Sequence, residues 1–333
     1  MKNLKTVLIV ILMLIFFSGC AKKEVEEKPT LKMAAIYVGT IQDGDWTTLG
    51  YIALQEVGKK YNIETSYSQK VSVADAEQVM KEYIAKGYNI IFADSAEYVN
   101  PVDNIADQYP NVSFISYAEE QPKNPKPNIW YINRNYYSGA YVLGALAALT
   151  TKTGKIGFIG ALDLPFLRGQ INAIKQAIKD LGLNTQFDYV FVGSFDDPVK
   201  AKQAAESFIS KGVDVLINVV NLGIYGIFQA AKEAETSVYV TCMYTDKGDL
   251  APDNFLTADL FNFTPTLDYI VGEIVKGTKG GYTFMEFGEN KARYPRFPIS
   301  NVTDDINNRV KQIADDVASG KIQVTVNMDT INP

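Results

Sequence analysis

Aromatic, acidic and amide side chains recur in the loops that follow the predicted strands. An aromatic face can stack on a planar ring, while a carboxylate or amide side chain reads the N–H and C=O groups of that ring. A buried Asp that accepts a ring N–H also rejects analogues without that donor, because its charge would lie unpaired. We therefore expect a binding site for a planar heterocycle. Its candidate residues are Asp43, Trp46, Thr47, Ser95, Asp163, Phe166, Asn221, Tyr225, Tyr244, Asp259 and Phe261.

Three of the nearby carboxylates also have a purely structural explanation. Asp43 or Asp45 can accept backbone amides at the start of the helix predicted from Trp46. Asp163 precedes Pro165 at another predicted helix start, so helix capping explains it equally well. An acid–base pair among the same three carboxylates would be the best case for an enzyme. No nucleophile, metal-binding cluster or cofactor motif accompanies them in the sequence.

Composition excludes several other kinds of site. The chain has 333 residues and no His, which removes the commonest general base, the usual Ser-His-Asp triad and most zinc sites. Two cysteines, Cys20 and Cys242, cannot form a disulfide framework once Cys20 is assigned to lipid. Gly223 and Gly226 lack the Gly-Lys-Ser/Thr that completes a phosphate-binding loop. The net charge of −6 argues against nucleic-acid binding. We expect a binding protein with no catalytic residue, metal or cofactor.

The N-terminal segment predicts export. Lys2 and Lys5 precede an apolar run at residues 7–17, which is shorter than the roughly 20 residues that a bilayer span requires. Small residues then lead directly to Cys20, as at a lipoprotein processing site. We expect residues 1–19 to be a lipoprotein signal peptide, Cys20 to carry the lipid, and residues 20–31 to tether the protein to the outer face of the cell membrane. The alternative is an uncleaved anchor with an incidental cysteine.

Strand and helix patterns alternate from Leu31 onward, and the series restarts near residue 133. This order is typical of parallel sheets built from right-handed crossovers. The length suits two lobes, each with its own core. We therefore predict an α/β fold of two doubly wound lobes. Ligands of such folds bind outside the carboxyl ends of the strands, so we expect the site in the cleft between the lobes.

Three segments resemble the basic membrane protein (BMP) family of lipoproteins. Residues 43–47 are similar to its Asp-Lys-Ser-Phe-Asn motif, and residues 153–165 to its Thr-Gly-Lys-Val-Gly-Phe-Val-Gly-Gly-Met-Asp-Ile-Pro. Residues 215–233 align without gaps on the family segment whose Ala-Gly-Gly-Thr-Gly loop opens a helix. The resemblance extends over residues 31–325. It implies a substrate-binding component of an ABC importer for purine nucleosides, with Trp46 as the stacking ring and Asp163 as the base-contacting Asp.

The resemblance also implies the domain boundaries. It predicts a type I periplasmic-binding-protein-like fold with a hinge of three crossings, near residues 132–135, 256–262 and about 283. The first lobe would hold residues 32–133 and about 259–283, and the second residues 134–258 and about 284–333. The lobes would close on the ligand and present a surface to a membrane permease. We expect a monomer.

Departures from the family motifs concern the sugar. Tyr244 stands where the family has the Asp that holds ribose hydroxyls, and Phe261 replaces a Lys that also serves the sugar. Asn221 and Tyr225 interrupt the glycine loop. These changes favour a purine base or a related ring without its ribose, with a nucleoside as the closest competitor. The alternative function is an extracellular ligand sensor that signals to a membrane receptor.

Overall fold

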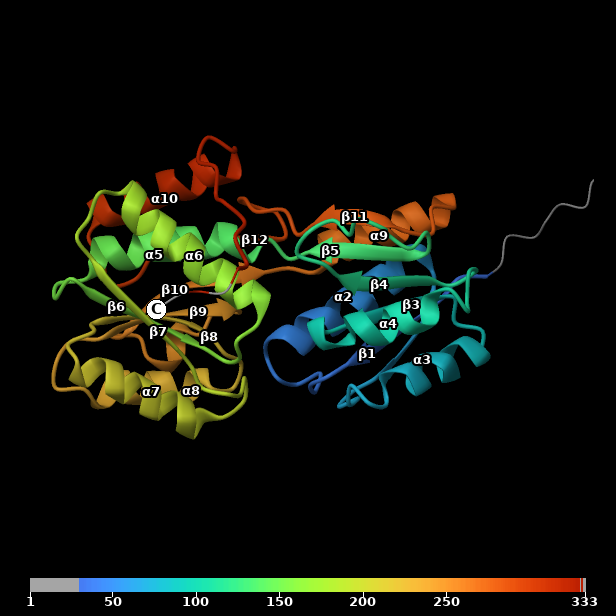
Figure 1. Ribbon diagram of the computed structural model, residues 1–333, viewed down its shortest axis with the longest axis horizontal. Coiled ribbons are helices and arrows are strands. Elements are labelled where there is room, and N and C mark those ends of the chain that lie inside the picture. The colour runs from blue at the N-terminus through green and yellow to red at the C-terminus, as the bar shows by residue number, and fades with distance from the viewer. Residues whose placement is uncertain (1–29, 330, 332–333) are drawn as a thin grey trace, which may run out of the picture. The chain divides into compact units, whose positions relative to one another are not determined.

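The computed structural model describes residues 30–329 and 331, which contain two six-stranded sheets (Figure 1). The predicted signal peptide, Cys20 and most of the predicted tether lie outside these residues. Within the described part of the chain, every helix is too short or too polar to cross a membrane.

The first sheet is parallel throughout and has the strand order β11-β5-β4-β3-β1-β2. Its strands are β1 (Lys32–Tyr37), β2 (Glu64–Ser68), β3 (Ile90–Asp94), β4 (Ser113–Tyr117), β5 (Ile129–Asn133) and β11 (Gly281–Phe284). Helices α2 (Trp46–Tyr61) and α9 (Thr264–Lys276) cover one face, and α3 (Ala76–Ala85) and α4 (Val99–Ala106) cover the other.

Strand β1 illustrates why its sequence reads as one apolar run. Met33 and Ala35 pack into the core under α2, whereas Ala34 and Ile36 pack into the core under α3 and α4. Successive side chains of a strand point to opposite faces, and helices cover both faces here, so all five positions from Met33 to Tyr37 are buried.

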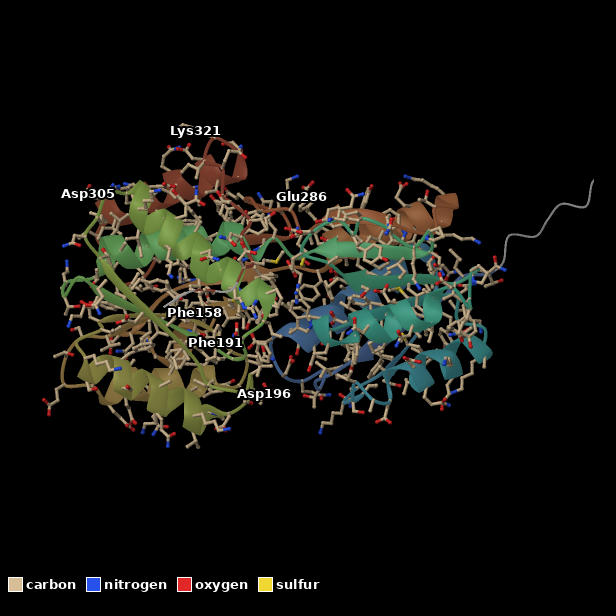
Figure 2. The ribbon with its side chains drawn as sticks, viewed as in Figure 1. Phe158, Phe191, Asp196, Glu286, Asp305 and Lys321 are labelled. Atoms are coloured by element: carbon tan, nitrogen blue, oxygen red, sulfur yellow. The ribbon has the colours of Figure 1, made fainter. Side chains whose placement is uncertain are left out.

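The second sheet has the order β12-β10-β9-β8-β6-β7, with β12 as its antiparallel edge. Its strands are β6 (Lys155–Gly160), β7 (Gln186–Phe191), β8 (Val215–Val219), β9 (Tyr239–Tyr244), β10 (Phe255–Phe261) and β12 (Arg293–Pro295). Helices α5 (Tyr136–Thr150), α6 (Pro165–Asp180) and α10 (Asp304–Ala318) lie on one face, and α7 (Pro198–Ser210) and α8 (Ile224–Glu233) on the other. Figure 2 shows Phe158 of β6 inside this lobe and Asp305 and Lys321 at its outside.

Three connections join the lobes. The chain passes from β5 to α5 through residues 134–135, from β10 to α9 through residues 262–263, and from β11 to β12 through residues 285–292. The sequence placed the second crossing within residues 256–262 and gave residues from about 259 onward to the first lobe. In the structure, Asp259 and Leu260 pair with Met243 and Tyr244 of β9, so these residues belong to the second sheet.

Candidate functional site

A cavity of about 70 Å³ lies between the carboxyl ends of the two sets of strands. We call it the interlobe cavity. The first lobe and the first crossing contribute Val38, Trp46, Ser95, Ala96, Glu97 and Arg134 to its wall. The second lobe contributes Tyr136, Leu164, Phe166, Phe195, Asn221 and Tyr244. Both lobes therefore supply aromatic and polar groups to one cavity, where the topology of doubly wound sheets places ligands.

Trp46 forms one wall of the interlobe cavity. It is the first residue of α2 and is 8% exposed. Its indole nitrogen donates to the carbonyl of Asp94 at 3.1 Å, and its ring lies 4.6 Å from that of Phe263 and 5.6 Å from that of Tyr244. These contacts fix the plane of the indole before any ligand arrives, which reduces the ordering cost of stacking.

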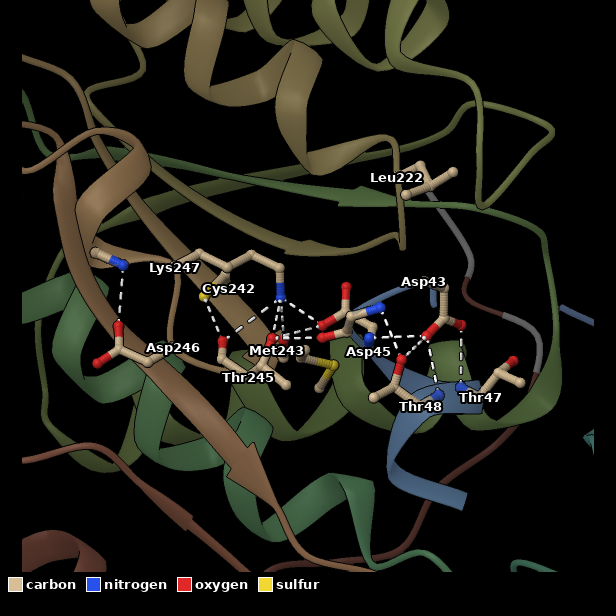
Figure 3. Close-up of polar contacts among 12 residues, drawn as sticks. Asp43, Asp45, Thr47, Thr48, Leu222, Cys242, Met243, Thr245, Asp246 and Lys247 are labelled. Carbon is tan, nitrogen blue, oxygen red and sulfur yellow. Dashed lines mark hydrogen bonds and ion pairs between the residues drawn. The ribbon is translucent and has the colours of Figure 1, made fainter. Parts of the chain in front are cut away.

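Asp43 caps helix α2, which is the structural role that the sequence offers for it. Its carboxylate accepts the backbone amides of Asp45 at 2.8 Å, Thr47 at 3.0 Å and Thr48 at 3.0 Å, together with the Thr48 hydroxyl at 2.9 Å (Figure 3). Both oxygens are thus engaged in holding the turn that presents Trp46. Thr47 is buried and takes part through its backbone amide.

Tyr244 closes the opposite side at the end of β9. Its φ of 71° is rare for a residue with a side chain, and such strained backbone is found at functional sites. Its hydroxyl lies 3.2 Å from the Tyr136 hydroxyl, and burial raises the pKa of both phenols. The Tyr136 ring stacks on Phe166 at 5.1 Å. The second lobe therefore presents a rigid group of rings to Trp46.

Arg134 brings a positive charge into this aromatic group. It follows β5 at the first crossing and is 4% exposed. Its guanidinium carbon lies 4.4 Å from the centre of the Phe166 ring, 4.9 Å from Tyr136 and 5.8 Å from Trp46. Burial acts to lower the pKa of Arg134, but the carboxylate of Glu119 outweighs it and raises the pKa, so the guanidinium stays charged.

A second buried arginine lies behind the cavity. Arg293 of β12 forms an ion pair with Asp259 of β10, and both side chains are fully buried. The Arg293 guanidinium also donates to the carbonyl of Arg134 at 2.9 Å and lies 4.3 Å from the centre of the Phe261 ring. Asp259 is thus occupied by Arg293, and together they join two crossings of the hinge.

The structure places the candidate residues from the sequence in three groups. Trp46, Ser95, Phe166, Asn221 and Tyr244 line the interlobe cavity. Asp43, Thr47, Asp259 and Phe261 stand behind these residues and support them. Asp163 and Tyr225 lie outside: the Asp163 carboxylate is 57% exposed and pairs with Arg168 at 2.7 Å, and Tyr225 is 48% exposed.

An ion pair also bridges the lobes beside the cavity. Lys247, in the loop after β9, places its Nζ 2.5 Å from an oxygen of Asp45, and the two side chains are 9% and 4% exposed (Figure 3). The Thr245 hydroxyl lies 2.9 Å from the same Asp45 oxygen and 2.9 Å from the carbonyl of Gly44. Burial raises the pKa of Asp45 to about 6, although Lys247 acts in the opposite direction.

Sequence reasoning missed Arg134, Tyr136 and Lys247. Arg134 had an available signal, because it directly follows a predicted strand at a predicted crossing. Lys247 had a weaker signal: it lies three residues beyond Tyr244, the last residue of β9, and next to Asp246. Around the interlobe cavity, the described residues assemble aromatic rings, the Arg134 guanidinium, the Glu97 carboxylate and neutral hydrogen-bonding groups. No cluster of metal-ligating side chains occurs among them.

Comparison with known proteins assigns the family. Residues 30–292 match the Bmp family of PnrA-like ABC transporter substrate-binding proteins. The chain belongs to this family. It is therefore a substrate-binding protein of an ABC transporter that works outside the cytoplasm, with a small-molecule ligand and a permease as partners. The resemblance seen in the sequence is confirmed.

Relatives and a solved structure agree with this assignment. A purine-binding protein of Brucella abortus is 26% identical over 300 residues, 89% of this chain and 83% of its own length. Basic membrane protein A2 of Borrelia garinii is 24% identical and covers 85% of each chain. An ABC transporter solute-binding protein from Conexibacter woesei has a TM-score of 0.69 at 22% identity, over 89% of this chain and 99% of its own. The predicted fold class is confirmed.

Proposed function

We propose that this Bmp-family protein captures a planar heterocycle, a purine base or a related ring, in the interlobe cavity. The observation that supports the proposal is the aromatic wall supplied by both lobes: Trp46 lines the cavity together with Tyr244 and Phe166, and the Trp46 ring lies edge-on to that of Tyr244. Such rings stack on any flat π-system, and each stacked base contributes about 1–3 kcal/mol. The purine-binding relative from Brucella abortus supports the same class of ligand.

The rings packed beside the cavity favour a base over a nucleoside. The interlobe cavity measures about 70 Å³, below the about 300–1,000 Å³ of usual small-molecule pockets, so any ligand requires the lobes to separate. Tyr244 and Phe261, which replace the polar sugar ligands of the family motifs, pack against each other at 5.1 Å beside it. A ribose would have to displace these buried rings. A single flat ring system needs only a modest separation of the lobes.

Polar groups at the edge of the cavity would read the ring. The side-chain amide of Asn221 and the carboxylate of Glu97 both line it, and neither has a hydrogen-bond partner among the described residues. An amide and a carboxylate together can pair with adjacent N–H and C=O groups of a heterocycle. We assign Asn221 this role in preference to Asp163, whose carboxylate is held by Arg168.

Delivery would follow from closure of the lobes. Ligand between Trp46 and Phe166 bridges the two lobes, and the Asp45–Lys247 ion pair fastens the same closure from outside the cavity. In the closed form, the two lobes together would present the surface that a permease recognises. Processing at Cys20 would keep this monomer tethered to the outer face of the membrane, close to that permease.

Titration calorimetry with purified protein tests the ligand class. Guanine, hypoxanthine, xanthine and adenine should bind, and guanosine and adenosine should bind more weakly than the bases. Trp46→Ala should weaken binding of the best base by about 1–3 kcal/mol, because it removes one stacking face. Tyr225→Ala, an exposed ring outside the cavity, is the matched control and should bind normally. Nucleosides that bind 100-fold tighter than their bases would defeat the base proposal.

A further inference from the structure

The geometry points to Arg134 as the residue that selects purines carrying a ring carbonyl over those carrying an amino group at the same position. This inference rests on the proposed capture of a purine-like ring. It adds the chemical identity of the ligand's edge, which the aromatic walls cannot determine because every purine offers the same flat face.

Arg134 stands where it can touch a ligand held by the rings. It lines the interlobe cavity, and its guanidinium lies beside Trp46 and Phe166, the two rings that would hold a base from opposite lobes. Arg293 lies behind it, and its guanidinium donates a hydrogen bond to the backbone carbonyl of Arg134 at 2.9 Å. This contact fixes the backbone from which the Arg134 side chain extends.

The hydrogen bonds of the guanidinium leave one nitrogen available. Nε donates to Glu119 at 2.6 Å and Nη2 pairs with the same carboxylate. Nη1 has no partner among the described residues. A charged donor in a water-poor site is costly when unpaired, so a ligand that brings an acceptor to Nη1 gains more than one that does not.

Arginine presents donors only and accepts nothing. A carbonyl oxygen at the edge of a purine can accept from Nη1, whereas an exocyclic amino group is itself a donor and would leave both groups unpaired. Hypoxanthine and adenine are the pair for this comparison: they differ in a carbonyl or an amino group at ring position 6, and also in a donor or an acceptor at N1, so the variant without Arg134 is needed to isolate the contact at position 6. A hydrogen bond to a charged group corresponds to about 10–100-fold in affinity.

Charge around the cavity favours a neutral ligand. Glu119 balances Arg134, and the Glu97 carboxylate also faces the cavity. An anionic ring would meet this second carboxylate. The expected ligand is thus a neutral oxopurine, such as hypoxanthine or guanine, whose carbonyl oxygen accepts from Arg134.

Calorimetric titration of the full chain with hypoxanthine and with adenine measures the selection. We expect the wild type to bind hypoxanthine about 10–100-fold more tightly. Arg134→Met alone would leave Glu119 buried without a cation, so the test variant is Arg134→Met combined with Glu119→Gln, which removes both charges together. This double variant should bind both bases within threefold of each other. Glu119→Gln alone keeps the arginine and should keep the preference.

The outcomes separate the two proposals. Equal binding of the two bases by the wild type, or a preference that survives in the double variant, would overturn the role of Arg134 and leave purine capture intact. Failure of the wild type to bind any purine would overturn purine capture and the role of Arg134 with it. Unaltered adenine affinity in the double variant shows that the cavity is still folded.

Discussion

The burial of Asp45, despite its ion pair with Lys247, makes the stability of the protein depend on pH in an unusual direction. An ordinary ion-paired Asp has a lowered pKa and stabilises the fold as pH rises. Burial instead raises the pKa of Asp45 to about 6, from an ordinary value of 3.8 that the unfolded chain retains. The native state therefore binds the proton more tightly than the unfolded state.

The sign and size follow from that difference. The contribution of Asp45 to stability is fully present below pH 3.8 and is lost as pH rises through about 6. Between pH 5 and pH 7, the wild type should lose about 1 kcal/mol more free energy of unfolding than Asp45→Asn, which cannot titrate. Burial also raises the pKa of Asp94, to about 8. Its titration changes the free energy of unfolding of both proteins equally with pH, so it cancels in the comparison.

Urea unfolding of both proteins at pH 5, 6, 7 and 8 gives the difference directly. Asp163→Asn is the matched control, because it makes the same chemical change in an exposed carboxylate and should leave the wild-type profile unaltered. A difference between wild type and Asp45→Asn that stays flat from pH 5 to 7, or that grows in the opposite direction, would refute the reasoning. It would mean that attraction to Lys247 outweighs the burial of Asp45.

Three further predictions concern the hinge, a helix contact and the exposed carboxylate. Asp259→Asn should destabilise the fold by about 3–5 kcal/mol in thermal or urea unfolding, because it leaves Arg293 fully buried without its anion. Gly226→Ala should also destabilise it, since a Cβ there would lie 1.9 Å from the carbonyl of Pro198; melting at the wild-type temperature would contradict this contact between α8 and α7. Asp163→Asn should bind purine bases with wild-type affinity by calorimetry, and a tenfold loss would return Asp163 to the site.

Local pattern was enough to predict most of the elements. The residue patterns at 46–61 and 136–150 by themselves predict helices, and the structure has α2 and α5 over the same residues. The first begins after a polar turn and ends at Asn62 in the left-handed conformation, which stops a helix. The second is apolar on all sides because the lobe buries it on all sides. Such signals are carried by neighbouring residues and need no knowledge of the distant chain.

The site could be predicted only in part. Five residues singled out for their position at strand ends line one cavity in the structure: Trp46, Ser95, Phe166, Asn221 and Tyr244. The position of a carboxylate at a strand end did not predict its orientation, because the orientation depends on which cationic side chain the fold places beside it. Asp259 pairs with Arg293, 34 residues further along the chain, and its carboxylate lies behind the cavity wall. Asp163 meets Arg168 one helical turn along and stays in solvent.

The sequence by itself determined the family and the two α/β lobes, and it predicted the aromatic character of the candidate site. These properties follow from the order and period of apolar residues and from short motifs. Only the tertiary structure decided that Arg134 lines the cavity, that Asp259 forms an ion pair with Arg293, and that Asp45 forms an ion pair with Lys247 of the other lobe. The physical reason is that a buried charge needs a partner that offsets at least part of its desolvation, and the position of that partner is fixed by folding.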